Sequence, residues 1–475
     1  MRRTKIIATL GPSTDDPAIF QEMVTAGVDV VRLNFSHGSA EQHKRRAQLA
    51  RACAKAANKE IAIMADLQGP KIRIARFKNG KIELKENATF ILDANLATDA
   101  GDEHCVGIDY KNLPNDVHAG DMLLLDDGRL VLLADKIENN RIICRVIVGG
   151  ELSNNKGINR QGGGLTVKAL TEKDIADMKT AAEIGVDYVA ISFPRSADDM
   201  LEARRLLQGF NCHAGLIAKI ERIEAVDEID DIIRASDAVM VARGDLGVEI
   251  GDAELPAVQK HIIHRCRSLD KAVITATQMM ETMIHNAIPT RAEVFDVANA
   301  VIDGTDAVML SAETATGDHP AKVIAAMARI CLGAEKQAIT QISRHRVECQ
   351  FHRPDELIAM SAMYAANHFN ISAIIALTES GLTPLWMSRI RSGIPIYALT
   401  RNLASHRKMM LYRGVYPLYF TIETSDQHEL NKLAINECLQ HGVIKLGDWV
   451  LLSFGDQVGM HGGTNTLKVM PVTLK

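Results

Sequence analysis

The stretch SDAVMVARGDLGVEIG, from Ser236 to Gly251, joins a short apolar run to a pair of opposite charges. Ala238 to Ala242 has the composition of a strand that is buried on both faces. The run stops at Arg243, Gly244 and Asp245. Because burying charged groups without a use is costly, the end of this strand is a candidate for a polar functional site.

Seven other short apolar runs resemble this one, and amphipathic stretches separate most of them. Residues 171–185 are such a stretch, with Thr171 and Asp174 as helix N-terminal signals and Gly185 as a C-terminal one. A repeated strand–helix pattern with eight strands predicts an α/β fold, a closed parallel (β/α)8 barrel of the TIM type. The eight runs are residues 5–10, 28–35, 61–67, 186–193, 215–220, 238–243, 272–278 and 307–313.

Two segments depart from this rhythm. Residues 69–167 contain alternating runs and turn signals such as Asp127-Gly128, which predict an inserted, small β-barrel-like lid domain with a glycine-rich hinge near 153–165. After about residue 340, strands and helices predict an open, mostly parallel C-terminal α/β domain. The expected domains are therefore the barrel (1–68 and 168–340), the lid (69–167) and the C-terminal domain (341–475).

Composition excludes several classes of protein. The chain has 475 residues, 47% hydrophobic and 24% charged, with a net charge of −5, so neither nucleic acid nor a membrane is indicated as a partner. No apolar run has the length of a membrane-spanning helix. The eight cysteines form no C-x-x-C pair, and we expect a reduced, cytoplasmic protein.

Polar residues follow nearly every barrel strand. Because the carboxyl ends of barrel strands meet at one face, these residues are expected to converge there. Two carboxylates, Glu221 and Asp245, suit Mg²⁺ with phosphate oxygens and water completing its shell. Lys219 and Arg32 suit charge on a transferring phosphoryl group. The residues at strand ends are Arg32, Asn34, Ser36, His37, Asp66, Lys71, Arg73, Ser192, Lys219, Glu221, Arg243, Asp245, Thr277, Ser311 and Glu313.

Each of these residues also has a purely structural interpretation. Lys219 and Glu221 would share one face of a strand and form an ion pair. Asp245 would stabilise the turn after Gly244. Thr277 would be an ordinary β-branched strand residue, and His37 a solvated loop residue. The convergence of the whole set at one end of eight strands favours the functional interpretation.

Long motifs in this sequence resemble the pyruvate kinase family. They are TKIIATLGPS, VRLNFSHG, DLQGPKIR, LDDGRL, NNKGIN, IAKIERIEAV, MVARGDLGVEI, TATQMMETMI, PTRAEVFDVANAV and DGTDAVMLSAETATGDHP, in the family's order. The resemblance covers the whole chain and is strongest in the barrel. It implies Mg²⁺-dependent phosphoryl transfer (Mn²⁺ is the alternative ion) from phosphoenolpyruvate to ADP, which gives pyruvate and ATP.

The resemblance also implies a role for individual residues. Glu221 and Asp245 would hold Mg²⁺, and Lys219 and Arg32 would contact the transferring phosphoryl group. Gly244, Asp245, Thr277 and Ser192 would surround the substrate, and Thr277 would act through water in protonating the enolate. The nucleotide would lie near Arg73, Lys156, His37 and Pro12. Asn34, Ser36 and Asp66 match the monovalent-cation ligands of the family.

One position departs from the pattern of many family members, which carry an acidic residue where this chain has Lys71. An ammonium there would supply the positive charge that K⁺ supplies elsewhere. Leu67 and Gln68 resemble the subgroup with this lysine. We therefore predict activity without added K⁺, the alternative being that Lys71 points to solvent and the cation site is intact.

The stretch TESGLT, residues 378–383, follows an expected strand and opens an expected helix. In the family this loop binds a phosphorylated effector, so Thr378, Ser380, Gly381 and Thr383 are candidates, with residues 454–469 as a second wall. A phosphorylated sugar and AMP are the candidate effectors. The local alternative is helix N-capping by Ser380 or Thr383. The family also implies a homotetramer.

Two other functions share parts of this pattern. A Mg²⁺-dependent barrel lyase or aldolase acting on a pyruvate enolate would use Glu221, Asp245 and Gly244 but would not need Lys156. A catalytically silent metabolite sensor would not need Lys219 or Thr277.

Overall fold

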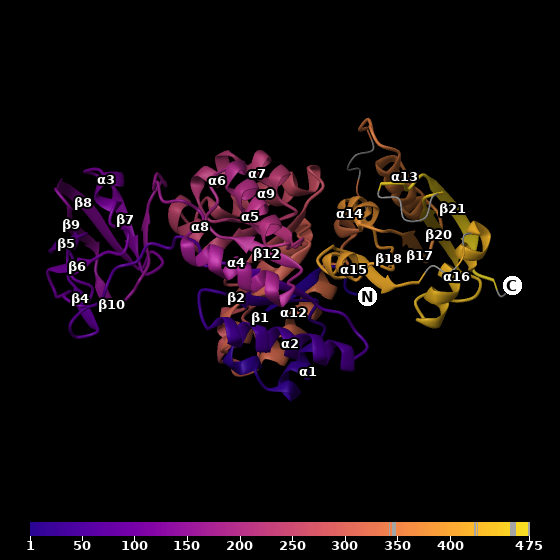
Figure 1. The fold of residues 1–475 in the computed structure, drawn as a ribbon, viewed down its shortest axis with the longest axis horizontal. Coiled ribbons are helices and arrows are strands. Elements are labelled where there is room, and N and C mark those ends of the chain that lie inside the picture. The colour runs from indigo at the N-terminus through magenta and orange to yellow at the C-terminus, as the bar shows by residue number, and fades with distance from the viewer. Residues whose placement is uncertain (342, 344–347, 422–423, 425, 457–461, 474–475) are drawn as a thin grey trace.

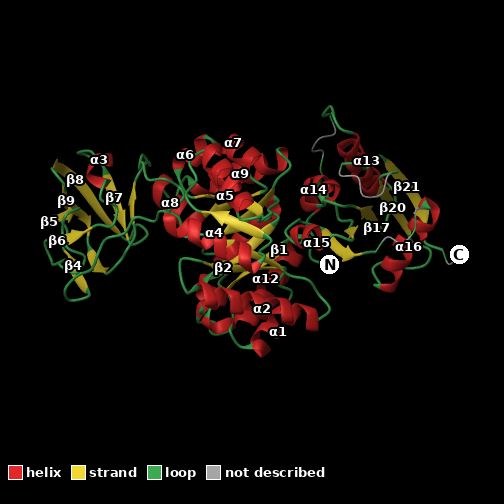
Figure 2. Cartoon of the chain, viewed as in Figure 1, coloured by secondary structure: helices red, strands yellow, loops and turns green. Residues whose placement is uncertain are grey.

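A computed structural model of the chain describes residues 1–341, 343, 348–421, 424, 426–456 and 462–473. Three bodies follow one another along the longest axis, with a β-rich lid at one end, an α/β barrel in the middle and a second α/β domain at the other end (Figure 1). The colouring by secondary structure in Figure 2 separates the helix-poor lid from the two other bodies.

The central body is a closed barrel of eight parallel strands, in the order β1-β16-β15-β14-β13-β12-β3-β2, as the sequence predicts. Each strand pairs with its neighbours in parallel register, for example Arg32 with Met64 and Lys219 with Met240. The strands are β1 (Lys5–Leu10), β2 (Val30–Asn34), β3 (Ala62–Asp66), β12 (Tyr188–Ile191), β13 (Gly215–Ile220), β14 (Ala238–Ala242), β15 (Ala272–Ala276) and β16 (Ala307–Leu310).

Helices surround the barrel, and local sequence signals set their ends. Thr171 and Asp174 form a capping box at the start of α4, and Gly185 ends it at φ 70°. The helices are α1 (Pro17–Ala26), α2 (Ala40–Ala56), α4 (Glu172–Ile184), α5 (Ala197–Gly209), α6 (Ile223–Asp227), α7 (Ile229–Ala235), α8 (Arg243–Ile250), α9 (Leu255–Ser268), α10 (Arg291–Asp303), α11 (Ala312–Ala315), α12 (Pro320–Ala334), and the 3₁₀ turns η1 (Pro12–Thr14), η2 (Glu281–Ile284) and η3 (Ala338–Thr340).

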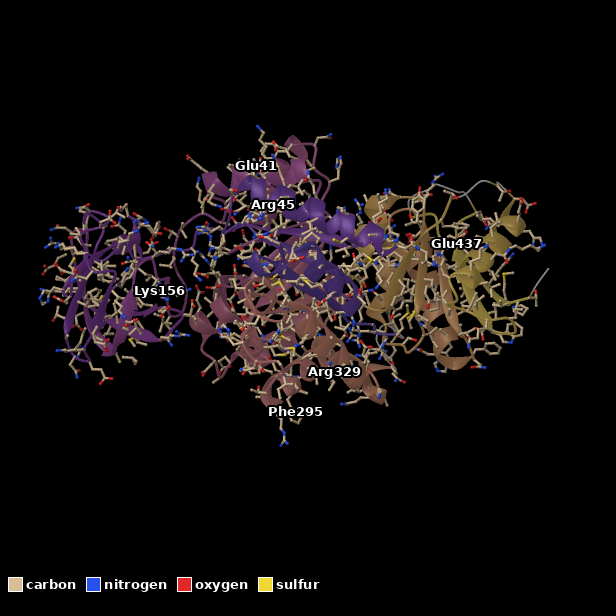
Figure 3. All side chains as sticks on the ribbon, turned by 90° about the horizontal axis from the view of Figure 1, so that it is seen from below. Glu41, Arg45, Lys156, Phe295, Arg329 and Glu437 are labelled. Atoms are coloured by element: carbon tan, nitrogen blue, oxygen red, sulfur yellow. The ribbon has the colours of Figure 1, made fainter. Side chains whose placement is uncertain are left out.

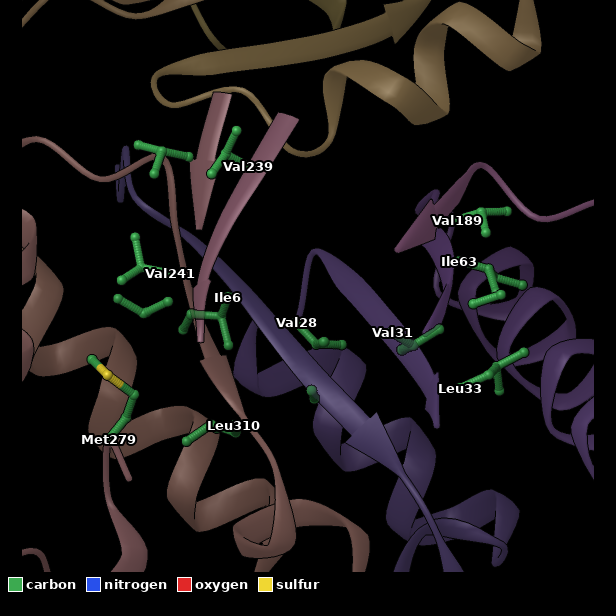
Figure 4. Packing of buried hydrophobic residues seen from close by; sticks show 14 of the residues in the cluster. Ile6, Val28, Val31, Leu33, Ile63, Val189, Val239, Val241, Met279 and Leu310 are labelled. Carbon is green, nitrogen blue, oxygen red and sulfur yellow. The ribbon is translucent and has the colours of Figure 1, made fainter. Parts of the chain in front are cut away.

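Two apolar cores hold the barrel together. Strand residues such as Ile6, Val31 and Leu310 pack outward against the helices (Figure 4). Alternate strand residues, among them Ile7, Met64 and Met240, fill the interior, and Leu411 from the C-terminal domain packs against this interior cluster. The barrel is therefore a packed core, and an active site is expected at the carboxyl ends of its strands.

The lid follows β3 and consists of a six-stranded and a two-stranded sheet around one apolar core. Asp126, Asp127 and Gly128 form the predicted turn with positive φ angles. The boundaries at residues 69 and 167 stay a prediction. The elements are β4 (Lys81–Leu84), β5 (Thr89–Asp93), β6 (Cys105–Gly107), α3 (Leu113–Asp116), β7 (Met122–Leu125), β8 (Leu130–Glu138), β9 (Arg141–Val148), β10 (Gly150–Ser153) and β11 (Ile158–Arg160).

The C-terminal domain is an open sheet in the order β19-β18-β17-β20-β21. All neighbours are parallel except β21, which pairs antiparallel with β20. The elements are α13 (Pro354–His368), β17 (Ala373–Leu377), α14 (Leu382–Arg389), β18 (Ile396–Thr400), α15 (Leu403–Met409), β19 (Val415–Tyr419), α16 (Gln427–Gln440), β20 (Trp449–Phe454) and β21 (Thr466–Pro471). Within the described part of the chain, no helix combines the length and apolar character needed to cross a membrane.

Candidate functional site

Lys219 lies at the centre of the charged cluster at the carboxyl end of the barrel. Its ammonium is 2.9 Å from Glu221 Oε1 and 3.2 Å from Asp66 Oδ1, and it donates to Ser192 Oγ at 2.7 Å. Burial alone would lower the pKa of Lys219, but the Asp66 and Glu221 carboxylates outweigh it and raise that pKa. The lysine is therefore a fixed cation at the barrel mouth, and the ion pair with Glu221 does form.

Asp66, at the end of β3, connects Lys219 with a second cation. Arg32 from the neighbouring strand β2 donates its Nε to Asp66 Oδ2 at 2.6 Å and its Nη1 to Thr9 Oγ1 at 3.1 Å. Burial would raise the pKa of Asp66, but the two cations lower it. The three side chains form one buried row in which the Asp66 carboxylate lies between two cations, and β12 separates the strand of Lys219 from the strand of Asp66.

Glu221 and Asp245 are the two carboxylates predicted to hold a divalent metal ion. Glu221 Oε2 accepts a hydrogen bond from the backbone N–H of Phe193 at 2.8 Å, which fixes the carboxylate. Burial raises the pKa of Glu221 against the effect of Lys219, and the nearby charge of Asp245 raises it further. The negative charge of Asp245 therefore repels that of Glu221, and a cation between the two carboxylates would relieve this repulsion.

A metal ion at this site would need ligands beyond the protein. Among the described residues, no group of three or more His, Cys, Asp and Glu side chains has the geometry of a metal site. Two carboxylates suit Mg²⁺, which usually retains water and substrate oxygens in its shell. The donor set therefore fits an ion whose coordination shell is completed by water and substrate oxygens.

The charged end of strand β14 is the start of a helix. Arg243 follows β14 directly as the first residue of α8, and Asp245 lies in the first turn of this helix, where a negative charge is favourable. The backbone N–H of Gly244 donates to Thr277 Oγ1 at 2.9 Å. A Cβ on Gly244 would lie 3.8 Å from the same oxygen, so glycine leaves the space in front of Thr277 open.

Thr277 has an unusual backbone conformation that a second residue supports. Its φ is 68° and that of Gln278 is 52°, in the left-handed region that β-branched residues rarely adopt. Arg243 donates Nε to the Ala276 carbonyl at 3.1 Å and Nη2 to the Thr277 carbonyl at 2.5 Å. Asp296 on α10 holds the same guanidinium through Nη1 at 2.7 Å. The sequence marks Arg243 by its charge but does not indicate this role.

Lys71 lies beside Asp245. Its ammonium donates to Asp245 Oδ1 at 3.0 Å and is 3.7 Å from Asp127 Oδ1 in the turn between β7 and β8. Burial would lower the pKa of Lys71, but Asp245 and Asp127 raise it. The side chain therefore joins the lid to the barrel mouth and does not point freely to solvent. The sequence pattern indicates Asp127 only as a turn residue.

The expected monovalent-cation residues are Asn34 at the end of β2, Ser36 just after this strand, and Asp66 at the end of β3. Asn34 Oδ1 accepts from the Ser36 backbone N–H at 3.2 Å, and Asp66 lies on the adjacent strand in register with Asn34. Both carboxylate oxygens of Asp66 already face a cation, Arg32 or Lys219. Lys71 pairs instead with Asp245 and Asp127.

The four expected nucleotide residues come from two regions. Pro12 in η1 and His37 after β2 are exposed and belong to the barrel. Arg73 donates to the Asn155 carbonyl at 3.0 Å, and Lys156 pairs with Asp126 at 2.7 Å, both on the lid side (Figure 3 labels Lys156). Arg73 and Lys156 therefore each have a partner within the lid.

The TESGLT loop forms a tight turn before α14. Gly381 is the N-cap residue at φ 82°, so neither Ser380 nor Thr383 occupies that position. The Gly381 N–H donates to Thr378 Oγ1 at 3.0 Å, and Thr383 Oγ1 lies 2.9 Å from Thr464 Oγ1. Thr464 belongs to the expected second wall, of which residues 457–461 lie outside the described residues.

Comparisons with known proteins agree with this geometry. The family model described as pyruvate kinase, barrel domain, matches residues 1–324, and that described as pyruvate kinase, alpha/beta domain, matches residues 356–470. The chain is 54% identical to a pyruvate kinase II from Salmonella typhimurium, over 99% of both chains. It is 54% identical to a pyruvate kinase from Haemophilus influenzae, over 98% of this chain and 97% of the relative. A pyruvate kinase from Geobacillus stearothermophilus is 41% identical, over 98% of this chain and 80% of the relative.

Proposed function

Because this chain belongs to the pyruvate kinase family, we propose that the charged cluster at its barrel mouth transfers the phosphoryl group from phosphoenolpyruvate to ADP. The chain is a phosphotransferase whose substrates and products are phosphoenolpyruvate, ADP, pyruvate and ATP. The family generally depends on Mg²⁺ and K⁺. Each step of the reaction can be assigned to residues of this chain.

Glu221 and Asp245 would hold Mg²⁺. The bound ion would neutralise charge on the phosphoryl oxygens and on the enolate oxygen. The support is the nearby charge of Asp245, which raises the pKa of Glu221, and the Phe193 N–H, which fixes the Glu221 carboxylate.

Lys219 and Arg32 stabilise the phosphoryl group as it moves. The bond between phosphorus and the enolate oxygen breaks, and a terminal phosphate oxygen of ADP forms the new bond. Lys219 is fixed by Glu221, Asp66 and Ser192. A cation held in this way has nothing to reorganise during the reaction, which is the condition for strong electrostatic stabilisation.

Thr277 and Gly244 hold the carboxylate of the substrate, and Thr277 orients the water that gives the enolate carbon its proton. The hydrogen bond between the Gly244 N–H and Thr277 Oγ1 brings the two groups to one side of the mouth. Arg73, Lys156, His37 and Pro12 contact the nucleotide. The lid excludes water, so that hydrolysis does not compete with transfer.

The observation that carries this proposal is the position of Lys219 between two buried carboxylates at the carboxyl end of the barrel. We expect Lys219→Met to lower kcat for pyruvate formation by about 10³–10⁵-fold, as for other phosphoryl-stabilising cations. Lys322→Met, at an exposed position on α12, serves as the matched control. A folded Lys219→Met variant with wild-type kcat would contradict the assignment, and thermal unfolding establishes that it is folded.

Lys71 removes the requirement for K⁺ in this chain. Its ammonium is already held at the mouth by Asp245 and Asp127, and Asp66 is already neutralised by Arg32 and Lys219. We expect wild-type kcat to agree within about twofold in K⁺ and in tetramethylammonium at equal ionic strength. Without K⁺, we expect Lys71→Gln to lower kcat about a hundredfold, which is the typical effect of removing one group that stabilises the transition state electrostatically. Adding K⁺ should restore the activity of this variant. Strong activation of the wild-type chain by K⁺ would refute this role.

The TESGLT loop binds the phosphate of an allosteric effector, a phosphorylated sugar or AMP, in a homotetramer. The support is the cluster of hydroxyl groups and turn N–H groups at Thr378, Ser380, Gly381 and Thr383, before α14. Substituting Ser380→Asp adds a negative charge there. We expect it to abolish activation by sugar phosphates and AMP while leaving basal activity unchanged. Analytical ultracentrifugation tests the tetramer.

A further inference from the structure

An arginine-lined cavity lies where the C-terminal domain meets the base of the barrel, at the end opposite the active site. The N-terminus enters this junction (Figure 1). The barrel contributes Arg3, Arg267 on α9 and Gly304 after α10. The C-terminal domain contributes Arg389 on α14, Arg391, Ser392 and Arg413. The cavity leaves about 20 Å³ for the centres of water molecules.

Two of the five arginines have full sets of partners. Arg389 forms a buried ion pair with Asp306, and both side chains are 1% exposed. Arg3 donates to the carbonyls of Thr340, Ser392 and Glu335, and its Nε lies 3.7 Å from the Glu335 carboxylate. Asp306 and Glu335 therefore neutralise Arg389 and Arg3, respectively.

The other three arginines form no ion pair with a carboxylate of any described residue. The guanidinium of Arg413 makes no hydrogen bond or ion pair with any described residue, although the residue is only 8% exposed, and its Nη2 is buried. Arg391 donates to three carbonyls, but its Nε is buried without a partner among the described residues. Arg267 has one acceptor within the described part of the chain, the Arg389 carbonyl at 2.9 Å.

The electrostatics of these arginines reflect this imbalance. Burial, followed by the charges of Arg391, Arg389 and Arg413, lowers the pKa of Arg267 to about 9. Burial and the charge of Arg3 lower the pKa of Arg413 to about 10, against the effect of Glu335 and Asp306. An unpaired buried cation costs several kcal/mol, so a folded protein is expected to provide a compensating anion.

We propose that this cavity binds a small oxyanion of the phosphate class, held by Arg413, Arg391 and Arg267. Guanidinium groups match the oxygens of phosphate through paired N–H donors. The space is on the order of one or two water molecules, which excludes a nucleotide or a whole sugar phosphate inside the cavity. Because the three arginines come from both bodies, the anion would fasten the C-terminal domain to the barrel.

The same chemistry is available from free inorganic phosphate and from the phosphate end of a small metabolite. We would therefore measure thermal unfolding of the full chain in inorganic phosphate and, separately, in glucose 6-phosphate. Potassium gluconate, whose anion is too large for the cavity, keeps K⁺ and ionic strength constant. The volume favours free phosphate, so we expect stabilisation by phosphate at concentrations where the sugar phosphate gives none through this site.

Arg413→Gln separates this site from the active site and from the TESGLT loop, where phosphate is also expected to bind. In gluconate this variant should be at least as stable as wild type, because it removes an unpaired buried charge. It should also lose the part of the phosphate stabilisation that comes from the cavity, with an affinity there about tenfold to a hundredfold weaker. Arg267→Gln, which is only half-buried, is the second variant and should weaken the same component.

Arg329→Gln, at an exposed position on α12, is the matched control and should behave as wild type. Equal phosphate stabilisation of wild type, Arg413→Gln and Arg267→Gln would overturn the proposal, as would no phosphate effect beyond that of gluconate. A loss of stability in Arg413→Gln that is the same in both salts would assign Arg413 to packing and also reject the anion site. These readouts do not depend on phosphoryl transfer at the barrel mouth.

Discussion

Arg243 is expected to control catalysis through the backbone conformation of Thr277. Thr277 and Gln278 both have positive φ angles, and each such residue costs about 1–3 kcal/mol, or about 2–6 kcal/mol for the two. The Arg243 guanidinium donates to the carbonyls of Ala276 and Thr277. Two hydrogen bonds from a charged donor contribute about 3–6 kcal/mol, which offsets the strain.

Without these bonds, the strained turn should relax and move Thr277 Oγ1 away from the Gly244 N–H. A displacement of about 1 Å at a reacting group lowers the rate about a hundredfold. We therefore expect Arg243→Met to lower kcat for pyruvate formation by about a hundredfold while the barrel stays folded. The assay is steady-state kinetics with phosphoenolpyruvate and ADP, accompanied by thermal unfolding.

Two further variants make this prediction specific. Arg329→Met, at an exposed position on α12, should leave kcat unchanged. The double variant of Arg243→Met and Thr277→Ala should be no slower than Thr277→Ala alone, because both changes remove the same interaction. A folded Arg243→Met variant with kcat within about threefold of wild type, or additive effects in the double variant, would refute the positioning role.

Three further predictions concern stability and the hinge. Burial raises the pKa of Glu249 from 4.5 to about 7. Between these two pH values the folded state binds more protons than the unfolded state, so the free energy of unfolding falls as pH rises, and Glu249→Gln should be up to about 3 kcal/mol more stable than wild type at pH 8 in urea unfolding. If the stabilities of the variant and the wild type depend on pH in the same way, the prediction is wrong. Gly163 has φ 73°, and a Cβ there would lie 2.6 Å from Ile223 Cγ2. Gly163→Ala should therefore displace the lid hinge and make it more sensitive to protease. Gly209→Ala is the control, because a Cβ at Gly209 would meet open space, and it should leave protease sensitivity unchanged. Removing the charge of Asp306 leaves the buried Arg389 unpaired, so Asp306→Asn should lower the free energy of unfolding by about 3–5 kcal/mol. The control is Asp231→Asn, which breaks the exposed ion pair with Arg234 and should cost less than about 1 kcal/mol. Equal losses of stability in the two variants would contradict the argument.

The barrel and the candidate residues at its mouth are predictable from local patterns in the sequence. Strands such as β1, β14 and β15 are largely apolar runs of buried residues, and such runs are visible without long-range information. Because parallel strands in a barrel all end at one face, the positions of Lys219, Glu221 and Asp245 at or just after the ends of their strands were enough to predict that they share that face. The helix signals at Thr171 and Gly185 are equally local.

The C-terminal sheet shows where local patterns were insufficient. Strand β21, residues Thr466–Pro471, lies at the edge and pairs antiparallel with β20, and its residues are mostly exposed or half-buried. An edge strand of this kind lacks the apolar run that marks the buried strands, so the sequence pattern does not predict it. The short helix α15 is likewise absent from the elements that the sequence predicts.

The pairing of the charges depends on the three-dimensional fold. The sequence identified Lys71 as unusual but did not reveal that its ammonium lies between Asp245 of the barrel and Asp127 of the lid. Likewise, the bonds from Arg243 to the strained Thr277, and the absence of any described partner for the Arg413 guanidinium, depend on side chains far apart in the chain. Charge pairing acts over a few ångströms in space, and sequence spacing does not encode such distances between separate elements.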